Sequence, residues 1–326
     1  MLPIVPGMTR FTFPDIPGQR GMATTRQLKE AGATLAVLQT LARTGHRVLR
    51  TVYSARPGPI PEHDKLVAAF LWAGERSMLT GVQALKLHGF DIDVTPPIAP
   101  FIVPATCRKR QRAAGVETIR AHTLPTPITR DDVQIAPIER ALADASRLRQ
   151  MTDRALKGLT ISILQKRRST PNRIAAELEL HKKNATGGVL EGTVAGRRGA
   201  WSVPEADLEA SVREHPALPP MLSNPKLVTA AGQLIGTPDG FFPDAGVVIQ
   251  VHSKAHHTGT DAEGFDRWTD TLERDLVYKT FDLIVIPVTP ETLHDRMGRF
   301  LAQVAAIVTP RLGWQSPHVR VAPPSA

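Results

Sequence analysis

The sequence has a single cysteine, Cys107, among its 326 residues. One cysteine cannot form an intramolecular disulfide, and no spacing of cysteines and histidines matches a structural zinc site. The proline- and glycine-rich stretch 1–21 lacks an apolar run long enough for a signal sequence or a membrane span. We therefore expect a cytoplasmic protein with no membrane contact.

Two kinds of chemistry find no support in the sequence. It has no glycine-rich loop of the P-loop or dinucleotide-binding type, so nucleotide-driven chemistry is not expected. No histidine or acid is placed beside Cys107 to make it a nucleophile, although three basic residues follow it. A buried or incidental thiol is the expectation for this residue.

The charge of the chain is unevenly distributed. Residues 1–200 contain 30 Lys and Arg against 16 Asp and Glu, whereas residues 201–326 contain 10 against 15. This asymmetry indicates that a polyanion meets the first part of the chain and not the last. The alternative is a basic surface that simply faces water.

Two short helices are predicted near the N-terminus, because Thr24-Thr25 can cap one helix and Thr34–Arg43 carries a leucine face. Gly32 separates them as a helix stop. The β-branched run His46–Ser54, punctuated by arginines, predicts a hairpin directly afterwards. This order is that of a winged helix-turn-helix, although a small subdomain that binds nothing has the same pattern.

The composition of later segments predicts further domains. We expect an α/β (α+β) protein with an irregular leader at 1–20, the winged helix at 21–60, a middle α/β region at 61–181, a linker at 182–200, an α/β sandwich at 201–312 and a tail at 313–326.

A DNA interface follows from the winged-helix order. The second helix would enter the major groove and the wing arginines would reach phosphates. A basic loop in the middle region would extend the footprint. The predicted contacts are Gln39, Thr40 and Arg43 in the groove, Arg47 and Arg50 on phosphates, and Arg108, Lys109, Arg110 and Arg112 in the loop.

The segment from about Gly21 to Gly89 resembles the N-terminal region of AbiEi-type antitoxins, which are regulators from type IV toxin–antitoxin systems. The resemblance rests on Gly21-Met22-Ala23-Thr24-Thr25-Arg26-Gln27-Leu28, on the wing residues Gly45, Arg47, Arg50, Val52 and Tyr53, and on Leu79-Thr80-Gly81, Ala84-Leu85 and Leu87-His88-Gly89. Thr51 stands where related sequences usually have glycine. The resemblance implies operator binding and repression of the protein's own operon.

The last domain, about Trp201 to Val308, resembles the Vsr-like branch of the PD-(D/E)xK nuclease fold. Such domains are expected to carry an acid on the first helix, an Asp at a strand start, an acid-x-acid pair on the next strand, then a His and an Arg-Asp on a helix. Glu205 and Asp239 match the first two positions. The acid pair is replaced by Gln250-Val251-His252.

The loss of both strand acids bears directly on metal binding. Mg²⁺ prefers anionic oxygen ligands, and glutamine offers a neutral carbonyl while histidine nitrogen is a poor magnesium ligand. Asp239, alone or with Glu205, would hold the ion weakly. Lys254 could still stabilise transition-state charge, and His256 or His257 could act as a base, although the histidines also fit a solvated strand end.

The sequence therefore predicts a DNA-binding regulator with a degenerate nuclease-like domain, with double-stranded DNA as its partner and no cofactor. The rival prediction is a Mg²⁺-dependent endonuclease that uses Glu205, Asp239, Gln250, Lys254 and His257. A third is an interaction module whose acidic last domain holds a basic toxin from the same operon.

Overall fold

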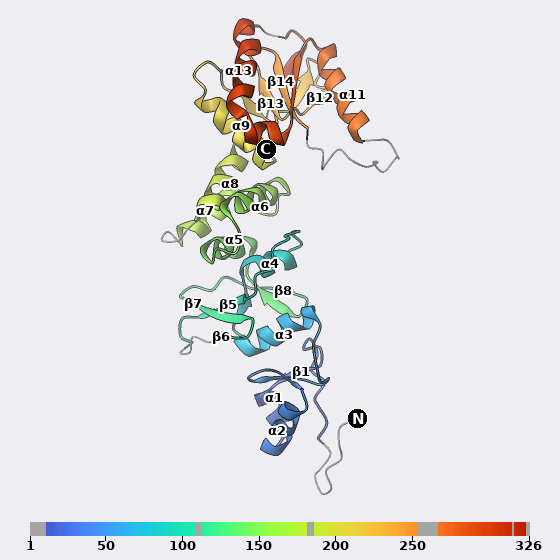
Figure 1. Cartoon of the computed structure of the whole chain (residues 1–326), viewed down its shortest axis with the longest axis vertical. Helices are drawn as coiled ribbons and strands as arrows, with labels where there is room; N and C mark the ends of the chain where they lie inside the picture. The colour runs from blue at the N-terminus through green and yellow to red at the C-terminus, as the bar shows by residue number, and fades with distance from the viewer. Residues whose placement is uncertain (1–10, 108–111, 181–185, 253–266, 315, 324–326) are drawn as a thin grey trace. The chain divides into compact units, whose positions relative to one another are not determined.

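The computed structural model describes residues 11–107, 112–180, 186–252, 267–314 and 316–323 (Figure 1). The chain has a mixed α/β fold and divides into two compact units. One comprises Met1–Thr152 with Ala176–Thr186, and the other Asp153–Ala175 with Gly187–Ala326. Across the described ranges, no helix has the length and apolarity needed to span a membrane.

The first unit begins with two helices and a small antiparallel sheet. The elements are β1 (Met22–Thr24), α1 (Thr25–Glu30), α2 (Leu35–Arg43), β2 (Arg47–Leu49) and β3 (Val52–Ser54), and the strand order is β1-β3-β2. The β2–β3 hairpin turns at Arg50 and Thr51, and neither residue has a positive φ. The turn therefore forms without a left-handed residue and needs no glycine.

The caps of these helices explain why they begin where the sequence predicted. Thr24 and Gln27 form a capping box, in which each side chain bonds the other residue's backbone N–H. Thr34 caps α2, and its hydroxyl accepts from the N–H of Val37 at 3.3 Å. Gly32, with φ of 91°, makes the left-handed turn between the helices.

The rest of the first unit is built on a six-stranded mixed sheet with the order β6-β7-β5-β4-β9-β8. Strand β5 pairs with β7 in parallel, and β4 pairs with β9 in parallel. The elements are α3 (Glu62–Ala73), β4 (Met78–Leu79), α4 (Gly81–Leu87), β5 (Ala99–Pro104), β6 (Arg112–Ala113), β7 (Val116–Ala121), β8 (Ile128–Arg130), β9 (Val133–Ile135) and α5 (Ile138–Arg147).

A buried ionic network ties α5 to the start of α4. Asp144 is fully buried and accepts from the Thr80 hydroxyl and from Arg140 Nε, both at 2.8 Å. Arg147 Nη2 lies 3.0 Å from the other carboxylate oxygen. A buried carboxylate is costly unless it is paired, and these partners supply that pairing.

The linker predicted at 182–200 is wrong over most of its length, because α8 (Gly187–Arg197) occupies it. Three of its glycines, Gly188, Gly192 and Gly196, recur every fourth residue and face α6 (Asp153–Gln165). A Cβ on Gly192 would lie 2.7 Å from the Lys157 carbonyl, so the helices approach closer than larger residues would permit. Glycine here marks helix packing and not a flexible connection. Residues 181–185 lie outside the described ranges.

The second unit carries a four-stranded sheet, β10-β13-β14-β15, in which β14 and β15 are parallel. A second sheet has the order β12-β11-β16. The elements are α7 (Pro171–Glu179, at the junction of the units), α9 (Val203–Glu214), β10 (Leu222–Ser223), β11 (Leu227–Thr229), β12 (Leu234–Gly236), β13 (Gly240–Phe242), β14 (Val247–Val251), α11 (Arg267–Thr280), β15 (Ile284–Val288), α12 (Pro290–Asp295), α13 (Met297–Val308), η1 (Thr309–Arg311) and β16 (Val319–Val321).

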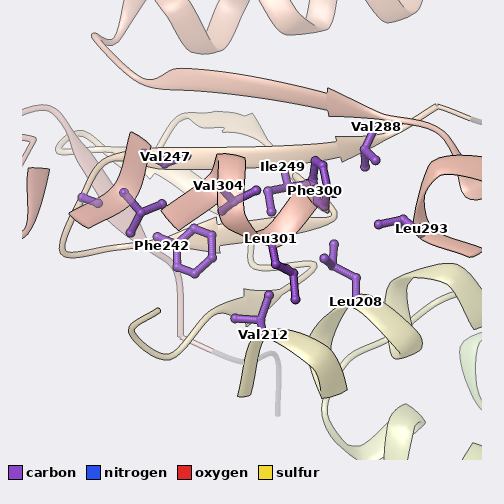
Figure 2. Packing of buried hydrophobic residues seen from close by; sticks show 12 residues of the cluster. Leu208, Val212, Phe242, Val247, Ile249, Val288, Leu293, Phe300, Leu301 and Val304 are labelled. Atoms are coloured by element: carbon purple, nitrogen blue, oxygen red, sulfur yellow. The ribbon is translucent and has the colours of Figure 1, made fainter. Parts of the chain in front are cut away.

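Alternate residues of β13 and β14 pack on opposite faces of the larger sheet, as strand geometry requires. Phe242, Val247 and Ile249 lie in a core with side chains of α9 and α13, as Figure 2 shows. Phe241 and Val248 lie in a second cluster with residues of α11 and β11. The near-continuous apolar sequence of β14 reflects its burial on both faces.

The strand pairing of this unit is antiparallel up to β14: β11 pairs with β12, while β13 pairs with β10 and β14. Helices α12 and α13 are separate, because Arg296 between them leaves the helical region at φ −139° and ψ 28°.

Candidate functional site

The α2 helix and the β2–β3 hairpin present a basic, acid-free surface. Residues 31–61 contain arginines but no aspartate or glutamate. The side chains of Gln39, Arg43, Arg47 and Arg50 are exposed. None of these three arginines forms an ion pair with a described residue. Their charges are therefore available to an external anion.

The packing beneath this surface fixes which side chains point outward. Leu38 and Leu41 of α2 are buried in a cluster that includes Leu28 and Tyr53. The other face of the helix is left toward solvent. Below the hairpin, His46 is buried, and its Nδ1 lies 2.8 Å from the carbonyl of Ser54, a contact that holds the hairpin against the end of α2.

One of the predicted DNA contacts is placed less favourably, and three lie outside the described residues. Thr40 is half-buried and its hydroxyl donates to the carbonyl of Ala36 at 2.9 Å, so the hydroxyl proton is already used within the helix. Arg112 lies exposed on β6. The other residues of the basic loop, Arg108, Lys109 and Arg110, lie outside the described residues.

A second group of polar side chains surrounds the start of β13 in the second unit. Asp239 accepts from the backbone N–H of Val251 at 2.6 Å, and its own N–H donates to Gln250 Oε1 at 3.4 Å. Tyr278 of α11 is buried and also hydrogen-bonds the side chain of Gln250. His252 Nε2 lies 3.3 Å from Asp275 Oδ2.

The electrostatics of this group are dominated by loss of water. The pKa of Asp239 is raised from 3.8 to about 7, mainly by burial and also by the nearby carboxylates of Glu205 and Asp275. The Val251 N–H and Arg274 act in the opposite direction. Burial and the same acidic surroundings raise the pKa of Tyr278 to about 12. Asp239 is thus a carboxyl that holds its proton to a much higher pH than an ordinary aspartate.

The carboxylate of Glu205 is engaged in holding the start of α9. Ser202 is the N-cap of this helix, and its hydroxyl donates to Glu205 Oε1 at 2.6 Å. The other oxygen accepts from the N–H of Trp201 at 2.9 Å and from Asn224 Nδ2 at 2.6 Å. Three donors on two oxygens assign this residue a capping function.

These residues do not fit a Mg²⁺ site. Both oxygens of Glu205 are occupied by donors, one oxygen of Asp239 is occupied by Val251, and Gln250 supplies only a neutral amide. Within the described ranges, no three histidine, cysteine, aspartate or glutamate side chains are grouped as a metal would require. The predicted Lys254, His256 and His257 lie outside these ranges.

Sequence reasoning did not assign Asp275 and Tyr278 to the group around Asp239. They come from α11, which is far from β13 along the chain, and both are buried against the sheet. Their spacing of three residues places them on one helix face, and Arg274-Asp275 matches the Arg-Asp expected on this helix. That pair was the signal that could have located both.

The sequence matches no protein-family model and no curated protein. Among solved structures, the chain is similar to the Rv2827c protein from Mycobacterium tuberculosis, with 18% sequence identity and a TM-score of 0.37. The alignment covers 55% of this chain and 74% of that chain. A likeness this distant carries no argument about function.

Proposed function

We propose that residues 21–60 form a winged helix-turn-helix that binds double-stranded DNA, and that the protein is a transcriptional regulator that represses its own operon, as the resemblance to AbiEi antitoxins implies. The observation that carries the proposal is the acid-free surface of α2 and the hairpin, with Arg43, Arg47 and Arg50 exposed and unpaired among the described residues. The rest of the first unit holds this surface in place.

The geometry supports different contacts for different parts of this surface, some with bases and some with phosphates. Gln39 and Arg43 lie on the solvent face of α2, where side chains can reach base edges in a major groove. Arg47 begins β2 and Arg50 lies in the hairpin turn, and both exposed side chains can reach phosphates. We therefore expect Arg47 and Arg50 to supply affinity and Gln39 and Arg43 to supply specificity.

The test is a salt series of fluorescence anisotropy titrations with the duplex upstream of the protein's own gene. Arg47→Ala and Arg50→Ala should each reduce the slope of log K against log salt by about 1, the effect of losing one phosphate contact. Arg26→Ala is the matched control, because Arg26 is exposed but paired with Glu75 at 2.7 Å. Unchanged slopes in both variants would place the interface elsewhere.

For the second unit we propose a nuclease-like domain that no longer cuts DNA. The engagement of Glu205 in the helix cap and the neutral amide of Gln250 support this proposal. Supercoiled plasmid incubated with the protein and Mg²⁺ or Mn²⁺ should stay intact. Nicking that disappears in Asp239→Ala would instead establish the endonuclease alternative.

A toxin encoded in the same operon is the remaining proposed partner. Type IV antitoxins are understood to counteract toxin action without a stable toxin complex, so we expect no co-purification of the two proteins. A stable complex that persists at high salt would favour the interaction module, in which the acidic last domain holds a basic protein.

A further inference from the structure

A groove of about 860 Å³ in the first unit lies between the β2–β3 hairpin, helices α3 and α4, and the turn that joins β6 to β7. Its apolar lining comes from half-buried side chains on three elements and two loops, namely Leu49, Ile60, Leu66, Leu87 and Pro96. This volume and this lining are typical of sites that bind small organic molecules.

The charges on the groove are unbalanced. Arg47, Lys65 and Lys86 line it together with one carboxylate, that of Glu62. Glu62 is already paired with Lys65, whose Nζ lies 2.5 Å away. Neither Arg47 nor Lys86 makes an ion pair within the part of the chain that the structure describes. Two positive charges therefore border an apolar floor without a counter-charge.

The lysine on α4 makes one side-chain hydrogen bond at the groove. Lys86 is half-buried, and its Nζ donates to the Thr95 hydroxyl at 2.8 Å. That contact uses one of the three ammonium protons and orients the other two. The Thr95 hydroxyl is neutral, so it does not balance the positive charge of Lys86. A bound carboxylate, sulfonate or phosphate would supply the opposite charge.

Duplex DNA does not match this lining. A duplex offers phosphates on a broad surface, and the apolar side chains of the groove floor would gain nothing from them. A molecule with an anionic head and an apolar body would use both features at once. We infer that the groove is an effector site for a small amphiphilic organic anion, with its head on Lys86 and Arg47 and its body on the apolar floor.

The position of Arg47 gives this site a regulatory consequence that rests on the proposed function. Arg47 lines the groove and is also one of the two hairpin arginines proposed to contact phosphate. An anion bound in the groove would engage the guanidinium and compete with the DNA backbone for it. Effector binding should then weaken DNA binding and reduce the salt slope by about 1.

The binding test uses isothermal titration calorimetry of the full chain, without DNA, with decanoate and with naphthalene-1-sulfonate as probes. We expect saturable binding of one molecule per chain for at least one probe. Lys86→Met should weaken it about tenfold, the loss expected for one charge-assisted hydrogen bond, whereas Lys86→Arg should retain it. Lys29→Met is the matched control, because Lys29 is exposed on α1 outside the groove.

Two further measurements make the outcome decisive. The neutral analogues decanol and 1-naphthalenemethanol should bind no better to wild type than to Lys86→Met, since they lack the anionic head. Circular dichroism should show that Lys86→Met keeps its fold. No saturable binding of either anion, or equal binding of the anions to wild type and Lys86→Met, would overturn the inference.

Failure of this site and failure of the proposed function are distinguishable. Anisotropy titrations with the upstream duplex, with and without the bound probe, measure DNA binding, which is the proposed function. Calorimetry measures probe binding separately. Probe binding without any DNA binding would leave the groove as a ligand site and remove the regulator. DNA binding without probe binding would retain the regulator and remove the effector site.

Discussion

The replacement Asp239→Asn should stabilise the second unit increasingly as the pH rises. The pKa of Asp239 is raised from 3.8 to about 7 in the folded protein, mainly by burial. The folded state therefore holds this proton more tightly than the unfolded state. The contribution of protonated Asp239 to the free energy of unfolding is fully present below about pH 4 and is lost as the pH rises to about 7. Asparagine has no proton to lose, so it escapes this decline.

The magnitude follows from the size of the shift. The difference between 3.8 and about 7 corresponds to about 4 kcal/mol at high pH, at 1.36 kcal/mol per pKa unit. Part of that penalty is already present at pH 5, and Asp239 keeps some solvent exposure. We therefore expect the free energy of unfolding of Asp239→Asn, relative to wild type, to rise by about 2 kcal/mol between pH 5 and pH 8. The Asn carbonyl can still accept from Val251.

The assay is urea unfolding followed by tryptophan fluorescence in a Trp72→Phe background. The three remaining tryptophans then all belong to the second unit. Comparison of variant and wild type at each pH cancels the contribution of other titrating groups. Asp244→Asn is the matched control, because Asp244 is exposed next to β13 and loses the same charge. A difference between Asp239→Asn and wild type that does not change with pH would refute the assignment of a buried, proton-holding carboxyl.

Four further variants test the buried ionic network and the packing. Asp144→Ala should lower the free energy of unfolding of the first unit by about 3 to 5 kcal/mol, because the buried Arg140 loses its closer partner and keeps only Glu177, 3.8 Å away; urea unfolding measures this. Gly192→Leu should destabilise the second unit by about 1 to 3 kcal/mol through its contact with α6, whereas Gly298→Ala, with open space around it, should be neutral or stabilising. Leu38→Ala should cost about 2 to 5 kcal/mol and weaken DNA binding, which anisotropy would detect.

The elements predicted well from sequence are those with local signals. The helices and hairpin near the N-terminus begin and end at caps and turns that neighbouring residues determine, as the hydroxyls of Thr24 and Thr34 show. The α8 helix was missed because its glycines favour a loop when taken singly. Their four-residue spacing has meaning only once α6 is known to lie against them.

The two candidate sites differ in the same way: one depends on local sequence patterns and the other on tertiary packing. The exposure of Arg43, Arg47 and Arg50 could be predicted, because apolar periodicity fixes the outward face of a short helix and hairpin. The association of Asp239 with Asp275 depends on how α11 packs on the sheet, and no local pattern sets that. DNA binding itself stays a prediction until it is measured.

The helix cap formed by Glu205 changes how mutagenesis of the second unit must be interpreted. Glu205→Ala would leave three donors, on Ser202, Trp201 and Asn224, without their acceptor at the start of α9. Any activity lost in that variant would therefore report a disturbed helix as readily as a missing catalytic acid. Glu205→Gln keeps an acceptor oxygen for part of this network, which makes it the more informative probe of whether charge at this position matters.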